Sequence, residues 1–302
     1  MASTAKIYIK VGQSLRSASE NYYKVLEFLG NGANAYAYRC LCTSGLNRGI
    51  EFVIKIQYNL STETRRERFL REAEFLRSCN HPAILMQYDY GTFVTARDRY
   101  PFIVTNYMQE TLLERMKKEI PFDLKVKFAC QLLSAVSFLQ RQHIIHRDIK
   151  PNNIFINNDS AILGDFGLIK KLNDDDSTSD TDDIELVKAT LVSGYAAMAR
   201  YYRTPELVDY ANHRAPLYLE SDIFQLGLVL TEMFTGKNPL RPAGNLYAPI
   251  ELDDIEVINA PHHSAVIRNI LMQMLQIDRS KRIGINSAMD KFTGIYVSKF
   301  HV

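Results

Sequence analysis

The first third of the chain alternates between apolar and polar positions, as strands with one buried face do. Glycine, asparagine and proline separate five such stretches: 22–30, 35–42, 49–58, 84–90 and 102–107. Short strands in this order predict a small antiparallel sheet of five strands. The polar, serine-rich residues 1–20 precede it, and within them Ile7, Ile9 and Val11 alternate as a candidate edge strand.

Beyond the sheet the apolar positions follow the 3.6-residue period of helices. A helical stripe covers 122–142, and shorter patterns lie near 265–275 and 286–291. Another helix, apolar nearly all round and therefore buried, runs from Ser221 to Gly236, with Ser221 as its expected N-cap.

Strands followed by helices predict an α+β fold. We expect residues 1–20 to form an extension, residues 21–108 a small sheet with one long helix, and residues 109–302 a mainly helical region. The long helix of the first region is predicted over 64–79, where Thr64 and Glu67 have the spacing of a capping box.

A predicted hairpin gathers the residues with the most obvious chemistry. Apolar residues 154–156 and 161–163 flank a polar turn, so the two ends of the hairpin should lie close together. Asn153 precedes the first strand and Asp165 follows the second, which places two oxygen ligands suited to Mg²⁺ at one end. Asp148, five residues before Asn153, can then accept a hydroxyl proton beside the metal.

Composition adds limits rather than chemistry. The 302 residues are 46% hydrophobic and 23% charged, with a formal net charge of +2 that favours neither nucleic acid nor an anionic membrane as a partner. No apolar run approaches the length of a membrane span, and the first residues lack a signal-peptide core. Four cysteines without a metal-site spacing indicate reduced thiols and a cytoplasmic location, or a nuclear one in a eukaryote. The oligomeric state does not follow from the sequence.

Two motifs carry a resemblance to a known family. His146-Arg147-Asp148, followed by Lys150 and Asn153, and then Asp165-Phe166-Gly167, resemble the catalytic motifs of eukaryotic-type serine/threonine protein kinases. The resemblance implies transfer of the ATP γ-phosphoryl group to Ser or Thr hydroxyls of proteins. It implies that Asp148 takes the acceptor proton, that Lys150 neutralises γ-phosphate charge, and that Asn153 and Asp165 hold Mg²⁺, with Mn²⁺ as an alternative.

The resemblance continues in the predicted sheet. Residues 29–37 resemble a kinase Gly-rich loop, although Ala35 and Ala37 depart from its pattern, and a plain hairpin turn explains Gly-Asn-Gly equally well. Residues 106–108 resemble the hinge between the two lobes of a kinase, and the resemblance therefore implies a two-lobed fold, although a plain strand end is the other interpretation of these three residues. The residues to which the resemblance assigns ATP binding are Leu29, Gly30, Asn31, Gly32, Ala37, Val53, Lys55, Thr105, Asn106, Met108 and Phe155.

Lys55 is implied to grip the α- and β-phosphates while paired with a glutamate. Glu72 borders the apolar face of the helix predicted over 64–79, and it lies ten residues before Pro82, as the resemblance requires. Glu74 is the competing choice.

Residues 173–183, with six aspartates among serine and threonine, cannot bury a core and are expected to be a loop. A solvated insertion is one interpretation. The resemblance offers another, an activation loop whose phosphorylated residue, or whose aspartates, dock on Arg147. Thr181 and Thr190 are the candidate phosphorylation sites.

Other matches concern the helical lobe. Thr204-Pro205-Glu206 resembles the Ala-Pro-Glu motif of kinases, whose glutamate is implied to pair with Arg282, seventy-six residues later. Asp222 is implied to bond the backbone of the catalytic loop. Ala199 departs from the family, since a hydroxyl is usual at its position in serine/threonine kinases.

Three alternatives to an active serine/threonine kinase remain at this stage. A pseudokinase that binds ATP as a scaffold is favoured only by Ala35 and Ala199. A small-molecule kinase shares the two-lobed architecture but usually lacks the Glu206–Arg282 pair. A tyrosine or dual-specificity kinase is disfavoured by Lys150, two residues after Asp148.

Overall fold

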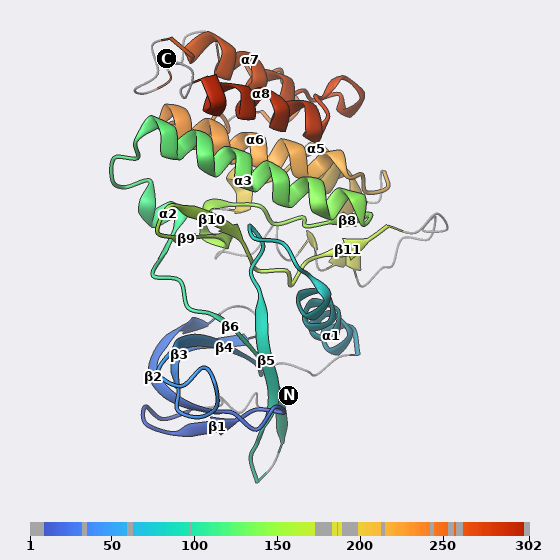
Figure 1. The fold of residues 1–302 in the computed structure, drawn as a ribbon. Coiled ribbons are helices and arrows are strands. Elements are labelled where there is room, and N and C mark those ends of the chain that lie inside the picture. The colour runs from blue at the N-terminus through green and yellow to red at the C-terminus, as the bar shows by residue number, and fades with distance from the viewer. Residues whose placement is uncertain are drawn as a thin grey trace. The chain divides into compact units, whose positions relative to one another are not determined.

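The computed structural model describes residues 9–31, 35–58, 63–96, 98–172, 183–185, 187–188, 199–212, 215–241, 245–252, 257 and 262–298. Contacts divide the chain into two compact units (Figure 1). A small unit comprises the chain up to Asn80 together with Leu85–Met108, and a large unit comprises His81–Ile84 together with Gln109 onward.

The small unit contains an antiparallel sheet and one long helix, α1 (Glu63–Ser78). The strands are β1 (Ser14–Arg16), β2 (Tyr22–Asn31), β3 (Ala35–Cys42), β4 (Glu51–Gln57), β5 (Gln87–Val94) and β6 (Arg99–Asn106). Their order in the sheet is β1-β2-β3-β4-β6-β5. The expected antiparallel sheet is therefore present, with β1 as a sixth strand at one edge in addition to the five predicted strands.

The additional strand lies within residues expected to precede the small lobe. The edge strand is Ser14–Arg16, and of the candidate stretch Ile7 lies outside the described residues, Ile9 is buried in the core and Val11 is exposed. Beyond β1 the chain also reaches the opposite edge of the sheet, where Ser17 pairs with Gly91. A buried carboxylate, that of Asp89, anchors the segment by accepting hydrogen bonds from Ser17 Oγ (2.6 Å) and Tyr23 Oη (3.0 Å).

Alternation along the strands gives this sheet two different faces. Phe52, Ile54 and Ile56 of β4 point into a core made with Tyr38 and Val104 from the neighbouring strands. The alternate residues of β4 carry polar chemistry on the other face. There Lys55 lies opposite Ala37 of β3, and Val53 lies opposite Thr105 of β6. Period-2 alternation therefore collects four of the residues assigned to ATP binding on one face.

The large unit is mainly helical. Its α-helices with described bounds are α2 (Leu112–Arg115), α3 (Phe122–Arg141), α5 (Pro205–Ala211), α6 (Glu220–Thr235), α7 (Ser264–Met274) and α8 (Ile285–Ser298). Its strands are β7 (Glu110–Thr111), β8 (Ile144–Ile145), β9 (Ile154–Asn157), β10 (Ser160–Leu163) and β11 (Lys170–Lys171). Its 3₁₀ helices with described bounds are η1 (Pro151–Asn153), η3 (Ala199–Tyr202) and η4 (Arg279–Lys281). The α+β class is confirmed.

Helix α6 packs against α3 and α7, and it is buried except at Glu220 and Glu232. Helix α6 contacts α8 through an aromatic pair, in which the ring of Phe234 stacks on that of Phe292 with centroids 5.7 Å apart. The helix ends at Gly236, whose φ of 72° is the left-handed conformation that glycine adopts without strain.

The expected N-cap of α6 is wrong. The cap position is Leu219, and Ser221 lies inside the first turn, where its hydroxyl is 2.7 Å from the Thr204 hydroxyl. Both hydroxyls are buried, and the Ser221 hydroxyl pairs with that of Thr204, which also accepts the Leu207 N–H at 3.1 Å as the N-cap of α5. Among the described residues, no helix combines the length and the apolar character needed to cross a membrane.

Candidate active site

The hairpin β9–β10 brings Asn153 and Asp165 to one end, as the pattern predicts. Ile154 pairs with Leu163 at the last register position, and the Gly164 N–H donates to the Asn153 carbonyl at 2.8 Å. Asn153 is buried and Asp165 is exposed. One buried amide and one accessible carboxylate therefore stand at the same end of the hairpin.

Asp148 lies at the centre of this cluster. Lys150 Nζ donates to both of its carboxylate oxygens at 2.8 Å, and Asn153 Nδ2 donates to Oδ2 at 2.8 Å. Burial, opposed by the charge of Lys150 and aided by that of Asp165, raises the pKa of Asp148 to about 6. A carboxylate with a raised pKa is a better proton acceptor than an ordinary aspartate.

A second set of bonds holds the backbone of the catalytic loop. The Asp222 carboxylate accepts hydrogen bonds from the backbone N–H groups of His146 (2.7 Å) and Arg147 (3.0 Å). The imidazole Nδ1 of His146 accepts a hydrogen bond from the backbone N–H of Asp148 (3.3 Å). Arg147 has a φ of 68°, a conformation that non-glycine residues adopt at a cost of about 1–3 kcal/mol. The bonds on both sides of Asp148 offset that cost and fix the direction of its side chain.

His146 also ties this loop to the hairpin. Its other ring nitrogen, Nε2, lies 3.1 Å from the Gly164 carbonyl, and its ring packs edge-on against Phe166. Burial lowers the pKa of His146 to about 4, so the ring is neutral at physiological pH. A neutral ring that accepts at Nδ1 carries its proton on Nε2, which matches donation to the carbonyl.

The donor set fits a hard divalent cation. The amide nitrogen of Asn153 faces Asp148, so its amide oxygen is the group left for a metal, and Asp165 adds a carboxylate. Mg²⁺ prefers such oxygen ligands and is often bound by one or two protein side chains together with substrate phosphates. Within the described residues, no cluster of three or more His, Cys, Asp or Glu side chains forms a separate metal site.

In the small unit, Lys55 is held by the glutamate that the sequence selected. Lys55 Nζ donates to Glu72 Oε1 at 2.7 Å, and the side chain of Glu72 is 6% exposed against 27% for Lys55. Glu74 is exposed and carries no such bond to Lys55. A cation fixed on one face of a sheet can bind an anionic group without first being ordered.

The other residues assigned to ATP binding are found in several places. Leu29, Gly30 and Asn31 end β2, Thr105 and Asn106 end β6, and Met108 ends the small unit. Phe155 lies in β9 of the large unit. Gly32 and its neighbours Ala33 and Asn34 lie outside the described residues, as do Thr181 and Thr190.

A model of the protein kinase domain matches residues 23–292. The chain belongs to the protein kinase domain family.

Curated relatives of this kinase domain carry serine/threonine-kinase names. A probable serine/threonine-protein kinase of Clostridium acetobutylicum is 32% identical over 225 residues, which are 72% of this chain and 31% of the relative. A probable serine/threonine-protein kinase of Clostridium perfringens is 28% identical over 226 residues, 72% of this chain and 29% of the relative. Serine/threonine-protein kinase PknB of Mycolicibacterium smegmatis is 32% identical over 176 residues, 57% and 26% respectively. The chain thus spans less than a third of the length of these relatives.

In this kinase domain Arg147 pairs with an aspartate of the acidic stretch. Its guanidinium donates to both oxygens of Asp183, at 2.6 and 3.0 Å, and its side chain is 1% exposed. The Tyr210 hydroxyl donates to the same carboxylate at 2.7 Å, and Lys170 Nζ lies 3.7 Å away. Despite burial, which raises it, these partners lower the pKa of Asp183 to about 2. The expected partner of Arg147 was either a phosphorylated residue or an aspartate of this stretch, and the contact observed is with an aspartate.

A second buried ion pair joins distant parts of the large unit. Arg282 Nη2 donates to Glu206 Oε1 at 2.8 Å, and the same guanidinium donates to the carbonyls of Gln276 (3.0 Å) and Glu220 (2.6 Å). The pair therefore connects the start of α5 with the segment before η4 and with the start of α6.

Sequence reasoning missed three contributors: His146 as an acceptor for the Asp148 N–H, Asp183 as the specific partner of Arg147, and Gln225. Gln225 bonds the catalytic loop at Ile149. Its only sequence signal is its place three residues after Asp222, on the same face of a helix.

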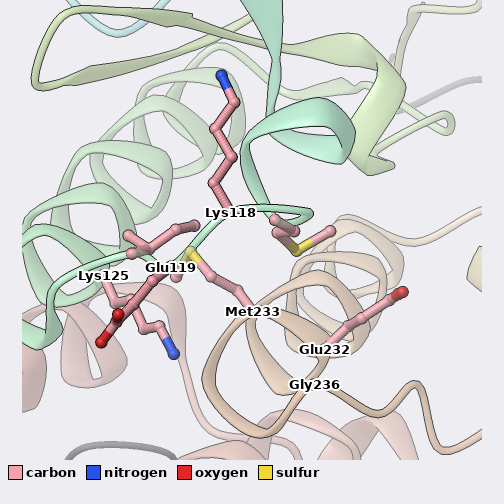
Figure 2. A pocket seen from close by; sticks show the side chains of 8 residues that line it. Lys118, Glu119, Lys125, Glu232, Met233 and Gly236 are labelled. Atoms are coloured by element: carbon pink, nitrogen blue, oxygen red, sulfur yellow. The ribbon is translucent and has the colours of Figure 1, made fainter.

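A pocket of about 190 Å³ lies elsewhere in the large unit, between the residues preceding α3 and the C-terminal end of α6 (Figure 2). Met116, Ile120 and Met233 form its apolar lining, and Lys125 lines it as well. Burial lowers the pKa of Lys125. None of the predicted site residues lines it, so it is separate from the cluster around Asp148.

Proposed function

We propose that the chain is the catalytic domain of an ATP-dependent serine/threonine protein kinase. The observation that carries this proposal is the environment of Asp148: a buried carboxylate bonded by Lys150 and Asn153, beside the carboxylate of Asp165. A structural aspartate in a loop would not need a cation and a potential metal ligand on the same carboxylate.

Each residue has a proposed task in the reaction. Asp148 orients the acceptor hydroxyl and takes its proton, while Lys150 neutralises charge that develops on the transferred phosphoryl group. Asn153 and Asp165 hold Mg²⁺, which supplies charge neutralisation at the phosphates when it is bound. Lys55, held by Glu72, binds the α- and β-phosphates, and the stretch from Leu29 to Ala37 covers them.

The remaining assignments concern the nucleotide base and the acceptor. Backbone groups of Asn106 and Met108 are the proposed partners of the adenine edge, and Val53, Thr105 and Phe155 its apolar surroundings. Proteins with Ser or Thr acceptors are the proposed substrates. The four free thiols, Cys40, Cys42, Cys79 and Cys130, support a reducing compartment such as the cytoplasm.

We further propose that Asp183 supplies the negative charge that activation-loop phosphorylation provides in other kinases. Its carboxylate already occupies the guanidinium of Arg147, so a phosphate on Thr181 or Thr190 is not needed to neutralise that cation. The domain would then be active without modification of its loop.

The test is incorporation of labelled phosphate from Mg·ATP into the purified chain and into a generic basic protein substrate, with Asp148→Asn as the matched control. Label on Ser or Thr with the wild type and none with the variant is the expected result. ATP binding without label in either protein, even after phosphorylation by another kinase, would instead identify a scaffold. Label on tyrosine would identify a kinase of different acceptor specificity.

A further inference from the structure

Helix α6 presents two buried polar side chains, one turn apart, to the backbone of the catalytic loop. Asp222 accepts the N–H groups of His146 and Arg147, as described above. Gln225 follows three residues later on the same face and is 3% exposed. Its role is not part of the assignments made from the family resemblance.

The side-chain amide of Gln225 makes three hydrogen bonds to main-chain groups. Its Oε1 accepts the Ile149 N–H at 3.0 Å, while its Nε2 donates to the carbonyls of Arg147 (3.2 Å) and Tyr202 (2.9 Å). The orientation of the amide is determined by these partners, since one side faces an N–H group and the other faces two carbonyls.

These contacts complete the anchoring around Asp148. The four consecutive N–H groups from His146 to Ile149 are all bonded to side-chain acceptors: two to Asp222, one to His146 and one to Gln225. The third bond of Gln225 leads elsewhere, to Tyr202, two residues before Thr204-Pro205-Glu206. One amide thus connects the loop that carries Asp148 with the segment that enters α5.

The chemistry restricts which side chain can do this. A methionine of similar length would leave one buried N–H group and two buried carbonyls without the partner they have now, which is unfavourable for each group. An ionised glutamate could still accept from Ile149 but would direct a negative oxygen at two carbonyls. Only a neutral amide of this length meets all three groups.

We infer that Gln225 is a positioning residue for phosphoryl transfer, one that holds the Asp148 loop in register with the Tyr202 segment. The inference rests on the proposed kinase function. Gln225 acts through the backbone of the Asp148 loop, so its replacement changes the rate of the chemical step more than the affinity for ATP.

The experiment compares Gln225→Met with Thr231→Val, both buried on α6. The Thr231 hydroxyl donates only to the carbonyl of Gly227 in its own helix, at 2.8 Å, so its removal perturbs α6 without touching the catalytic loop. We expect Gln225→Met to lower kcat at least tenfold, with the KM for ATP within twofold of wild type. Thr231→Val should leave both within twofold.

Hydrogen exchange of the Ile149 amide gives a readout that does not depend on activity. Exchange should be faster in Gln225→Met than in Thr231→Val, because only the first variant removes the acceptor of that N–H group. Gln225→Asn, which keeps the amide but shortens its reach, is the milder variant and should lie between wild type and Gln225→Met in both measurements.

The outcomes separate the two proposals. If the wild type shows no phosphate transfer that depends on Asp148, the kinase proposal is overturned. If hydrogen exchange of the Ile149 amide is then also unchanged in Gln225→Met, the present inference is overturned on separate evidence. An active wild type with equal kcat values in Gln225→Met and Thr231→Val overturns the inference alone. Failure of both Gln225 variants to fold, with Thr231→Val folded, would assign Gln225 a role in stability and overturn its positioning role.

Discussion

The two proposed halves of the chemistry are held in place in different ways. In the large unit, the loop around Asp148 is anchored through its backbone by buried side chains, and Asp222 is fully buried beneath it. In the small unit, Lys55 is paired with the side chain of Glu72, and 27% of the Lys55 side chain remains exposed.

This difference indicates which of the two, the Lys55–Glu72 pair or the Asp148 loop, can change its conformation more readily. Breaking a buried backbone bond leaves a polar group unsatisfied, at a cost of about 1–3 kcal/mol for each group, so the catalytic loop is effectively rigid. A partly exposed ion pair contributes about 0–1 kcal/mol, because water can solvate the lysine when the pair opens. The Lys55–Glu72 contact is therefore the adjustable element, and the Asp148 loop is the fixed one.

The largest expected effect comes from the centre of the rigid site. Asp148→Asn keeps the size and the burial of the side chain but removes the proton acceptor, so kcat should fall by about 10²–10⁴-fold. ATP affinity, measured by equilibrium binding, should change little. A variant that retains a tenth or more of the wild-type kcat would exclude Asp148 as the base.

Asp222→Ala should cause the largest loss of stability. Two buried N–H groups lose their acceptor, which predicts a decrease of about 2–6 kcal/mol in the free energy of unfolding, measured with denaturant. Gln225→Asn, one turn away, is the matched comparison and should lose less. A decrease below 1 kcal/mol for Asp222→Ala would show that the loop is held mainly by other contacts.

The same variant has a predicted dependence on pH. Burial raises the pKa of Asp222 to about 6, above its ordinary value of 3.8, so the folded state takes up a proton more readily than the unfolded chain. The stabilising contribution of Asp222 is therefore greatest below about pH 4 and declines as the pH rises through about 6. The stability difference between wild type and Asp222→Ala should be smaller at pH 7.5 than at pH 4.5. A difference that does not change would contradict the raised pKa.

Asp183→Asn tests a buried charge pair in the same unit. Arg147 would lose its anionic partner while remaining buried, at a cost of about 3 kcal/mol, and transfer by the unphosphorylated protein should fall about tenfold. Because the folded pKa of Asp183 is lowered to about 2, its contribution is present above about pH 4 and lost only as the pH falls toward 2. Between pH 5 and 8 the stability difference should be constant, unlike that of Asp222→Ala.

Glu185→Gln, at an exposed residue paired with Lys188 close by, is the control for that substitution. It should leave activity and stability unchanged. If phosphatase treatment abolishes wild-type activity while Asp183→Asn behaves as wild type does, Asp183 does not take the place of a phosphate.

The smallest expected change in stability concerns the adjustable element. Glu72→Gln should lower the free energy of unfolding by less than about 1 kcal/mol, since Lys55 can turn toward water. The activity should nevertheless fall, through a higher KM for ATP or a lower kcat, because the cation is no longer held in one position. Wild-type kinetics in this variant would mean that Lys55 does not need its partner.

Much of the site could be predicted because its residues lie close together in the sequence. The hairpin that joins Asn153 to Asp165 is read from two apolar runs and a polar turn, and the helix that carries Glu72 is read from its apolar stripe. Even the Glu206–Arg282 pair, distant in sequence, followed from matching two motifs of one family.

Other contacts could not be predicted, because they join segments that are distant in the sequence, and the apolar pattern of one segment does not indicate its contacts with the other. Ser17 and Asp89 meet only because the sheet bends until β1 reaches β5, which also makes residues 14–17 part of the small unit's sheet. Ser221 looked like a helix cap, but packing of α5 against α6 gave its hydroxyl a different partner.

By itself, the sequence determined which chemical groups come together locally: the carboxylates of Asp148 and Asp165 with the amide of Asn153, a lysine in a strand and a glutamate on a helix. Local periodicity and motif spacing suffice for these, because each depends on neighbours within a few turns or strands. Tertiary structure alone decided which of six aspartates meets Arg147 and which amide holds the Asp148 loop. Such choices depend on which buried polar groups face each other once the helices pack, and burial then makes an unmet partner costly.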